Sequence, residues 1–440
     1  MNNFQTILVA VFIFFFVAAV AIFSGLIKIN GLSKSATTPA GKVVIWGTFS
    51  NESFKNTVEI LKAGNSELSV SYVRKDSSFY QQDLIEAFAN GTAPDLFIIT
   101  PDMIKKNSNF IYKIPYENYP EKTFRDSFID GADIYMDSDG VLGFPVIVDP
   151  IVLYYNKDIL SNENIVFPPK SWDELFTLNS TLTKRDNSGT ISQSMIALGQ
   201  YANINNVKDI LATLLLQNSN PIVERGVGIG TTNTISYNFV LDDNPLKYSV
   251  SPIDSVLSFF LEFSNPSSTA YSWNRALPNS LDMFTGGKLA FYIGRASELF
   301  NIESINPNLS FDVAQIPQIK DAIIRRTYGE ISAVVINKKS ANFTTAFSVA
   351  GALSTGDGAT SLSTALSLPP VSRILLSTKP NNPYLFTFFN GALISRSWLD
   401  PDKVKSNLIF KELIENILSN SLSMSEALNK TRGQFELLLK

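Results

Sequence analysis

The sequence contains no cysteine and no histidine among its 440 residues. Without cysteine there is no disulfide, no thiol nucleophile, no thiolate metal site and no acylated cysteine to hold the chain on a membrane. Without histidine the commonest general base and metal ligand is missing, and every Ser-His or Cys-His catalytic arrangement is excluded. We therefore predict no metal site, no cofactor and no catalytic residue.

The charge of the chain limits its possible partners, and its length predicts the number of domains. The chain has 36 Lys and Arg residues against 40 Asp and Glu residues, a net charge of −4. No basic run is long enough to follow a phosphate backbone, so nucleic acid is excluded as a partner. A chain of 440 residues is too long for one typical hydrophobic core, which predicts two domains after the N-terminal segment.

The N-terminal segment is strongly apolar. No charged residue lies between Ile7 and Ile27, and about 20 apolar residues are enough to span the hydrocarbon core of a bilayer. The start of the chain lacks the basic residues of most cleavable signal peptides. We predict an uncleaved transmembrane anchor over residues 1–29 and a small polar linker over residues 30–41. The nearby lysines all follow the span, which by itself would keep the body inside the cell.

The next part of the sequence predicts strands that alternate with helices. Short apolar strands over 43–46, 69–73 and 96–99 are separated by helical patterns. The last strand is an unbroken apolar run of the kind found in buried parallel sheets. Such sheets bind ligands beyond the carboxyl ends of their strands, where Trp46 and Thr48 lie. The predicted fold class is therefore α/β.

One stretch, residues 140–160, indicates a passage between two α/β units. Two apolar runs meet there at Asp149 and Pro150, and a proline this close to a strand marks an end, an edge or a change of direction. We interpret the stretch as two strands that meet at a stiff joint. Residues 329–337 predict a return strand, and residues 368–371 predict a third connection.

Two capping boxes predict the starts of helices in the later part of the chain. Ser171 is followed three residues later by Glu174, and Ser423 by Glu426. In each pair the serine side chain is expected to accept a backbone hydrogen bond from the first helical turn while the glutamate reaches back to the serine. A helix is therefore expected to begin directly after each serine.

Several blocks of sequence, taken in order, resemble the extracellular solute-binding proteins of ABC importers, most nearly family 1, the sugar- or maltodextrin-binding type. The blocks are KVVIWGTF from Lys42, APDLFII from Ala93, GVLGFPVIVDPIVLYYNKDIL from Gly140, PPKSWDEL from Pro168, SMIALG from Ser194 and SWNRALPNSLDMFTGGKLAFYIG from Ser272. The resemblance extends over nearly the whole chain after the linker. It departs from the bacterial lipoprotein pattern because no cysteine follows the apolar segment.

The resemblance implies a periplasmic-binding-protein-like fold of type II, a Venus flytrap with two α/β lobes that close on a solute. It places residues 42–148 and 329–368 in the first lobe and residues 149–328 and 369–440 in the second. It also implies an extracytoplasmic body and ABC permease subunits as membrane partners. For the orientation in the membrane, we give this implication more weight than the lysines that follow the apolar segment. The chain would then be a membrane-anchored, monomeric receptor for a mono- or oligosaccharide.

Sugar sites combine aromatic rings, which stack on the sugar, with planar polar groups at its edge. The candidates at predicted strand ends or beside the expected cleft are Trp46, Thr48, Asp149, Trp273, Asn274, Tyr292, Arg295, Tyr328 and Glu330. Each aromatic candidate could instead pack in the core, and Asp149 could instead stabilise the hinge. Arg295 could bind a phosphate or carboxylate group, which would indicate an acidic or phosphorylated solute. Trp172 and Trp398 lie near helix starts and are expected to be structural.

Two other functions fit the same residues. A carbohydrate-active enzyme of the glycosidase type would work through paired carboxylates and needs no histidine, although no acid pair stands out in the sequence. A sensory or adhesion ectodomain would use the same fold without transport, and the predicted anchor fits it equally well.

Overall fold

The computed structural model of the chain describes residues 40–63, 65–226, 236–241 and 251–440. The anchor predicted over residues 1–29 and all but the end of the predicted linker lie outside these ranges. Among the helices within the described ranges, none is long and apolar enough to cross a membrane.

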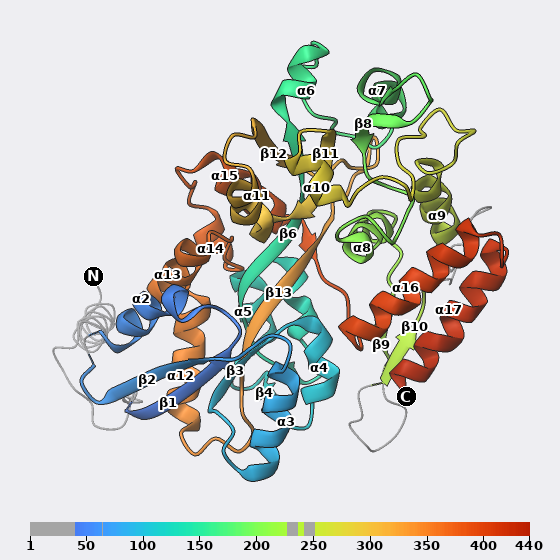
Figure 1. Cartoon of the computed structure of the whole chain (residues 1–440). Coiled ribbons are helices and arrows are strands. Elements are labelled where there is room, and N and C mark those ends of the chain that lie inside the picture. The colour runs from blue at the N-terminus through green and yellow to red at the C-terminus, as the bar shows by residue number, and fades with distance from the viewer. Residues whose placement is uncertain (1–39, 64, 227–235, 242–250) are drawn as a thin grey trace, which may run out of the picture.

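One end of the molecule, called the first half here, is built on parallel strands (Figure 1). Strand β1 (Gly41–Gly47) lies between β2 (Leu68–Arg74) and β3 (Leu96–Ile99) and runs parallel to both. The four residues of β3 are all buried, as its unbroken apolar run predicts. The helices of this half are α2 (Asn51–Lys62), α3 (Tyr80–Asn90), α4 (Pro101–Asn107), α12 (Phe343–Ser354) and α13 (Gly356–Leu366). The strands and helices expected here are confirmed.

Two long strands join the two halves and lie side by side in the centre of Figure 1. Strand β6 (Phe144–Asn156) is antiparallel to β13 (Thr327–Ile336) from Phe144 to Pro150. Beyond Pro150, β6 pairs instead with β11 (Leu289–Arg295) and β12 (Phe311–Gln315). The expected joint of two strands is therefore wrong, because β6 is one continuous strand. Pro150, which has no N–H to donate, lies where this strand changes partners.

The other end of the molecule, the second half, continues the same sheet. The strand order is β2-β1-β3-β13-β6-β11-β8-β7, with β12 beside β6 and β14 (Ser395–Arg396) beside β13. Strands β8 (Ile191–Ile196) and β7 (Lys184–Arg185) close this end. Helix α8 (Val207–Gln217) is buried on nearly every side, and α7 (Glu174–Leu182) and α9 (Pro252–Glu262) lie nearer the surface. The sheet therefore runs through both halves without interruption.

The C-terminal helices contact both halves. Helix α16 (Lys403–Leu418) packs against α17 (Met424–Leu439), and α17 packs on the hairpin of β9 (Val223–Gly226) and β10 (Ser236–Phe239). The Nζ atom of Lys106 in α4 lies 3.0 Å from Asp402, the residue before α16. The hydroxyl of Tyr201 in the second half donates to the Asn407 side chain of α16 over 2.7 Å. These helices therefore link the two halves outside the sheet.

The two predicted capping boxes have different outcomes. Ser423 and Glu426 exchange both backbone hydrogen bonds at the start of α17, so this box is confirmed. Glu174 does accept a hydrogen bond from the Ser171 N–H over 3.0 Å, but α7 begins only at Glu174. The N–H of Trp172 donates instead to the carbonyl of Gln318 over 3.1 Å, because this segment pairs with a neighbouring loop before the helix can start.

Shorter elements complete the described fold. They are β4 (Ile114–Pro115), α5 (Glu121–Ser127), η1 (Asp130–Tyr135), β5 (Gly140–Val141), α6 (Lys157–Asn162), α10 (Ser280–Thr285), η2 (Ala296–Glu298), α11 (Leu299–Ile305), α14 (Arg373–Leu376) and α15 (Pro383–Leu393). Residues 368–371 run beside β6, where the Val148 N–H donates to the Pro369 carbonyl over 3.1 Å.

Candidate functional site: a charged cluster at the hinge strands

Two carboxylates face each other across the strands that join the halves. The antiparallel register of β6 and β13 pairs Asp149 with Glu330. Both side chains are largely buried, with 14% and 16% of their side-chain surfaces exposed. Like charges directly opposite each other in a sheet are destabilising, so this arrangement requires a cation nearby.

Arg295 supplies that cation from the last residue of β11. One of its terminal nitrogens lies 2.9 Å from Glu330 and 4.0 Å from Asp149. The guanidinium also lies over the ring of Tyr328, 5.9 Å from its centroid, which adds a cation–π contact. Four predicted site residues thus meet in one cluster, namely Asp149, Arg295, Tyr328 and Glu330.

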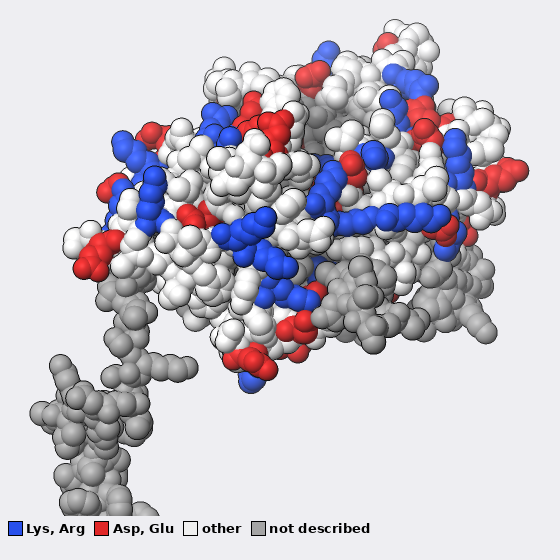
Figure 2. All heavy atoms as spheres, turned by 90° about the horizontal axis from the view of Figure 1, so that it is seen from below, with Lys and Arg blue, Asp and Glu red and all other residues white. Residues whose placement is uncertain are grey.

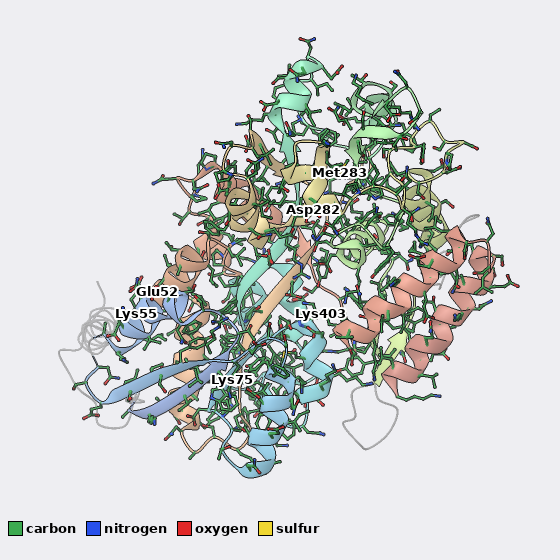
Figure 3. The ribbon with its side chains drawn as sticks, viewed as in Figure 1. Glu52, Lys55, Lys75, Asp282, Met283 and Lys403 are labelled. Atoms are coloured by element: carbon green, nitrogen blue, oxygen red, sulfur yellow. The ribbon has the colours of Figure 1, made fainter. Side chains whose placement is uncertain are left out.

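Asp209 and Lys403 complete the cluster and were not predicted. Asp209 of α8 accepts hydrogen bonds from two nitrogens of Arg295, over 2.8 and 2.7 Å. Lys403, the first residue of α16, lies 2.8 Å from Glu330, and Figure 3 shows it between α16 and the hinge strands. One signal in the sequence could have pointed to Asp209: the adjacent charges of Lys208 and Asp209 open an otherwise apolar helix, and buried charges need partners.

The surroundings shift the pKa values of the two facing carboxyls in opposite directions. Burial raises the pKa of Asp149 to about 6, although Arg295 and the hydrogen bonds from Ser297 partly offset it. Burial also acts to raise the pKa of Glu330, but Arg295 and Lys403 outweigh it and bring that pKa down to about 2. The pKa of Glu330 is therefore the lower one because two cations lie close to it. The closest hydrogen-bond partner of Asp149 is instead the hydroxyl of Ser297, at 2.6 Å.

A second ion pair lies against the cluster. Lys208 donates to Asp400 over 2.6 Å, and the Ser406 hydroxyl donates to the same carboxylate over 2.9 Å. From the first half, Asp102 at the start of α4 accepts the Thr100 hydroxyl over 2.6 Å, and burial raises its pKa. Side chains of both halves and of α16 thus meet at the hinge around a small space of about 10 Å³.

A cavity of about 760 Å³ opens beside this cluster, between the start of α8 and the start of α16. Its wall includes Arg295, Asp209 and Lys403 from the cluster. Hydrogen-bonding groups and apolar groups also face it, among them Tyr201, Asn206, Asn407, Ile204, Val404 and Leu408. A concave space of a few hundred cubic ångströms with a few convergent polar groups is the usual form of a small-molecule site.

Two predicted residues lie in the first half, at the carboxyl end of β1. Trp46 is half-buried, and the Nζ atom of Lys75 lies 3.8 Å from its ring centroid. Figure 3 shows Lys75 at the ends of these strands. Thr48 is exposed just after β1. The Tyr80 hydroxyl also donates to the Trp46 carbonyl over 3.0 Å. Among the described residues, no hydrogen bond, ion pair or ring contact joins Trp46 to the cluster.

Three predicted residues pack inside the second half instead. Trp273 has none of its surface exposed and donates through Nε1 to Asn203 over 3.1 Å. Tyr292 is 1% exposed, and its hydroxyl donates to Glu298. Asn274 donates to the Tyr271 hydroxyl over 2.9 Å. The core thus covers the rings of Trp273 and Tyr292 almost completely in this structure.

The remaining tryptophans are buried, as expected for structural residues. Trp172 is 5% exposed and donates to Gln217 over 2.6 Å. Trp398 is also 5% exposed and packs edge-on against Phe410 and Phe435.

Two α/β halves that share two joining strands, with a cavity beside these strands, are the arrangement found in hinged binding proteins. A model of the bacterial extracellular solute-binding proteins matches residues 56–379 of this chain. The chain belongs to that family. This membership confirms the resemblance seen in the sequence and the expectation of a binding protein rather than an enzyme.

Solved structures share the fold at low sequence identity. A cyclo/maltodextrin-binding protein, solved with maltotetraose, has a TM-score of 0.72 and 15% identity over 92% of this chain and 98% of that one. The cyclic alpha-maltosyl-1,6-maltose binding protein from Arthrobacter globiformis has a TM-score of 0.70 and 17% identity, covering 91% and 99%. The sugar-binding protein MalE from Xanthomonas citri has a TM-score of 0.70 and 15% identity, covering 91% and 97%. These similarities establish the two-lobed fold.

Proposed function

We propose that the chain is the receptor of an ABC importer and that it captures a mono- or oligosaccharide by closing its two halves on it. The observation that carries the proposal is the cavity of about 760 Å³ beside the hinge cluster, whose wall belongs to the second half and α16 and which the first half would cover on closure. A solute in that cavity would touch residues whose positions depend on the hinge strands, and binding that favours one arrangement of the halves is how such receptors signal. The sugars bound by the structurally similar receptors support the same class of solute.

A neutral solute fits the electrostatics better than an acidic one. Three of the four cations in the cavity wall are already paired: Arg295 with Asp209 and Glu330, Lys403 with Glu330, and Lys208 with Asp400. Lys411 is the one cation of this wall without an ion pair among the described residues. To bind Arg295, an acidic or phosphorylated solute would have to displace a buried carboxylate and leave that charge unpaired, at a cost of several kcal/mol. Neutral hydroxyls, by contrast, are good partners for carboxylate and amide groups.

The arrangement of the chain in the cell follows from the same proposal. Residues 42–148 with 329–368 would move as one lobe, and residues 149–328 with 369–440 as the other. The apolar N-terminal segment would hold this monomeric body outside the cytoplasm, next to the permease. Protease treatment of intact cells tests this sidedness, since protection of the body from cleavage would contradict it.

We assign the polar edge of the site to four residues predicted from sequence, Asp149, Arg295, Tyr328 and Glu330. On the first half, the site would be completed by Trp46 and Thr48. Trp273, Asn274 and Tyr292 are proposed to support the site from behind rather than to touch the solute. The three are held by hydrogen bonds within the second half.

A thermal-shift and calorimetry screen of the full-length protein tests the function. The probes are mono- and oligosaccharides, with glycerol phosphates and polyamines as charged comparisons. A ligand at about a hundred times its dissociation constant should stabilise the protein by about 2.7 kcal/mol. Stabilisation by a saccharide without turnover supports the receptor, whereas product formation or stabilisation by charged probes alone contradicts it.

A pair of variants tests whether the cavity is the site. Ala202 is exposed and lines the cavity, so Ala202→Trp should fill it without disturbing the core and weaken saccharide binding at least tenfold. Ala341 is equally exposed but lies beside α12, away from the cavity, and Ala341→Trp should leave affinity unchanged. Unchanged affinity in Ala202→Trp would show that the solute binds elsewhere.

A further inference from the structure

A second pocket, of about 510 Å³, lies where the first half meets the β9–β10 hairpin. The first half supplies most of its wall, from the end of α4, the loop before β4 and the loop after β13. Tyr237 of β10 faces these residues from the opposite side. This pocket shares no residue with the cavity beside the hinge cluster.

The wall of this pocket is basic. Lys105, Lys113 and Lys338 line it, against the single carboxylate of Asp137. Figure 2, seen from below, shows Lys and Arg side chains gathered in the middle of this side of the molecule. Asp137 and the adjacent Asp139 both pair with Lys113, so three lysines against these two carboxylates leave one positive charge in excess, which attracts anions.

Two of these lysines have no carboxylate partner among the described residues. Lys113 forms ion pairs with Asp137 and Asp139. Lys105 donates to the backbone carbonyl of Leu438 over 2.9 Å, and burial lowers its pKa. Lys338 is exposed, and no ion pair is found for it in the described part of the chain. Lys105 and Lys338 are therefore free to bind an external anion.

A buried hydroxyl points to the same conclusion. The hydroxyl oxygen of Tyr237 is shielded from solvent and has no hydrogen-bond partner within the described ranges. Lys105 lies over the same ring, 5.9 Å from its centroid. Buried polar groups are nearly always satisfied, so the Tyr237 hydroxyl keeps an unused hydrogen-bond donor beside this pocket.

The position of Tyr237 is well supported. Phe239 of the same strand stacks on Phe435 of α17, with ring centroids 4.8 Å apart. On the neighbouring strand, Arg225 donates to the backbone carbonyls of Ile134, over 2.7 Å, and of Met136. The hairpin is thus held both to the C-terminal helices and to the first half.

We propose that this pocket binds a phosphate group, carried by a soluble phosphorylated molecule or by a lipid headgroup. The ammonium groups of Lys105 and Lys338 would bind the phosphate oxygens, because charge-assisted hydrogen bonds to oxyanions are the strong ones. The Tyr237 hydroxyl would donate to a third oxygen. Because the wall comes from the first half and from the hairpin on the C-terminal helices, a bound phosphate would tie these parts together.

Calorimetry of the full-length protein with pyrophosphate tests the proposal. We expect saturable binding of one pyrophosphate per chain, weakened about tenfold by Lys338→Gln, the loss expected for one charge-assisted hydrogen bond. Tyr237→Phe, which removes only the hydroxyl, should weaken it several-fold. Lys339→Gln is the matched control, because Lys339 is the adjacent exposed lysine but does not line the pocket.

The outcomes separate a specific pocket from general attraction of anions. Equal losses in Lys338→Gln and Lys339→Gln, or no saturable binding, would overturn the proposal. Co-sedimentation with vesicles of phosphatidylglycerol, compared with vesicles of phosphatidylcholine, identifies the source of the phosphate. Vesicle binding that pyrophosphate displaces and Tyr237→Phe weakens assigns the pocket to a headgroup. Pyrophosphate binding without vesicle binding assigns it to a soluble molecule.

Discussion

The two strands that join the halves carry one carboxylate each at the same register position, yet the two groups have opposite properties. Asp149 on β6 has a pKa raised to about 6, and Glu330 on β13 has a pKa lowered to about 2. Both are similarly buried. The difference lies in distance to cations, since Glu330 is 2.9 Å from Arg295 and 2.8 Å from Lys403. Burial alone therefore does not decide the charge of a hinge residue.

The contrast between the pKa values of Asp149 and Glu330 depends most on Arg295, the cation that lies near both carboxylates. Arg295→Met should destabilise the protein by about 3–5 kcal/mol, because Asp209 would remain buried without a cation and Glu330 would keep only Lys403. Urea unfolding measures the loss. Arg275→Met is the control, since Arg275 is 61% exposed and pairs with Glu415 at the surface, where such pairs contribute at most about 1 kcal/mol. Equal losses in the two variants would contradict the central role of Arg295.

Asp149→Asn tests the other carboxyl through pH. A raised pKa means that the native state holds a proton more tightly than the unfolded state, so the contribution of Asp149 to stability is full below about pH 4. That contribution is lost as the pH rises through about 6. The free energy of unfolding of the wild type relative to Asp149→Asn should therefore fall by about 2 kcal/mol from pH 4 to pH 7.

Asp357→Asn is the control for this experiment, with the free energy of unfolding measured at the same two pH values. Asp357 is exposed in the first turn of α13, so Asp357→Asn controls for the loss of one carboxylate at the surface. A flat difference for Asp149→Asn would show that its carboxyl titrates normally. For Glu330 the sign is reversed, because a lowered pKa gives stability that is present above about pH 4.5 and lost as the pH falls toward 2.

Gly294→Ala should affect the two hinge carboxylates indirectly, because Gly294 directly precedes Arg295 in β11. A methyl group at Gly294 would lie 2.6 Å from a ring carbon of Tyr292 and 3.1 Å from one of Tyr154. Both rings are buried and cannot move freely, so we expect a loss of about 1–3 kcal/mol. Gly351→Ala in α12 meets no atom within 4 Å and should stabilise the protein by about 0.4–1 kcal/mol. Thermal unfolding of the two variants should move in opposite directions.

Lys403→Gln should have the smallest effect on stability and a clear effect on Glu330. The Lys403 side chain is 49% exposed, so its removal should cost less than about 1 kcal/mol. The pKa of Glu330 should rise toward its ordinary value, because Arg295 would be the only cation left beside it. NMR titration of the Glu330 carboxyl measures the shift. An unchanged pKa would mean that Arg295 alone accounts for the contrast between the two hinge carboxylates.

Much of the fold was predictable because it rests on local patterns. The unbroken apolar run of residues 96–99 became β3 with the predicted bounds, and the capping box at Ser423 begins α17. The helix expected at Ser171 begins later, because that segment pairs with the loop at Gln318. The break expected at Pro150 is absent, because β6 takes new partners there. Both errors concern contacts with segments more than a hundred residues away.

The candidate site was predictable only in part, for the same physical reason. Composition alone excluded thiol and histidine chemistry, and the positions of Asp149, Arg295, Tyr328 and Glu330 at strand ends and crossings were visible in the sequence. Asp209 and Lys403 joined them only when α8 and α16 packed against the hinge. The environment of Trp273 was likewise undecided, because polar neighbours in sequence do not show whether a ring is covered in space. Local patterns therefore determined the strands and helices, whereas packing between distant elements decided which side chains meet.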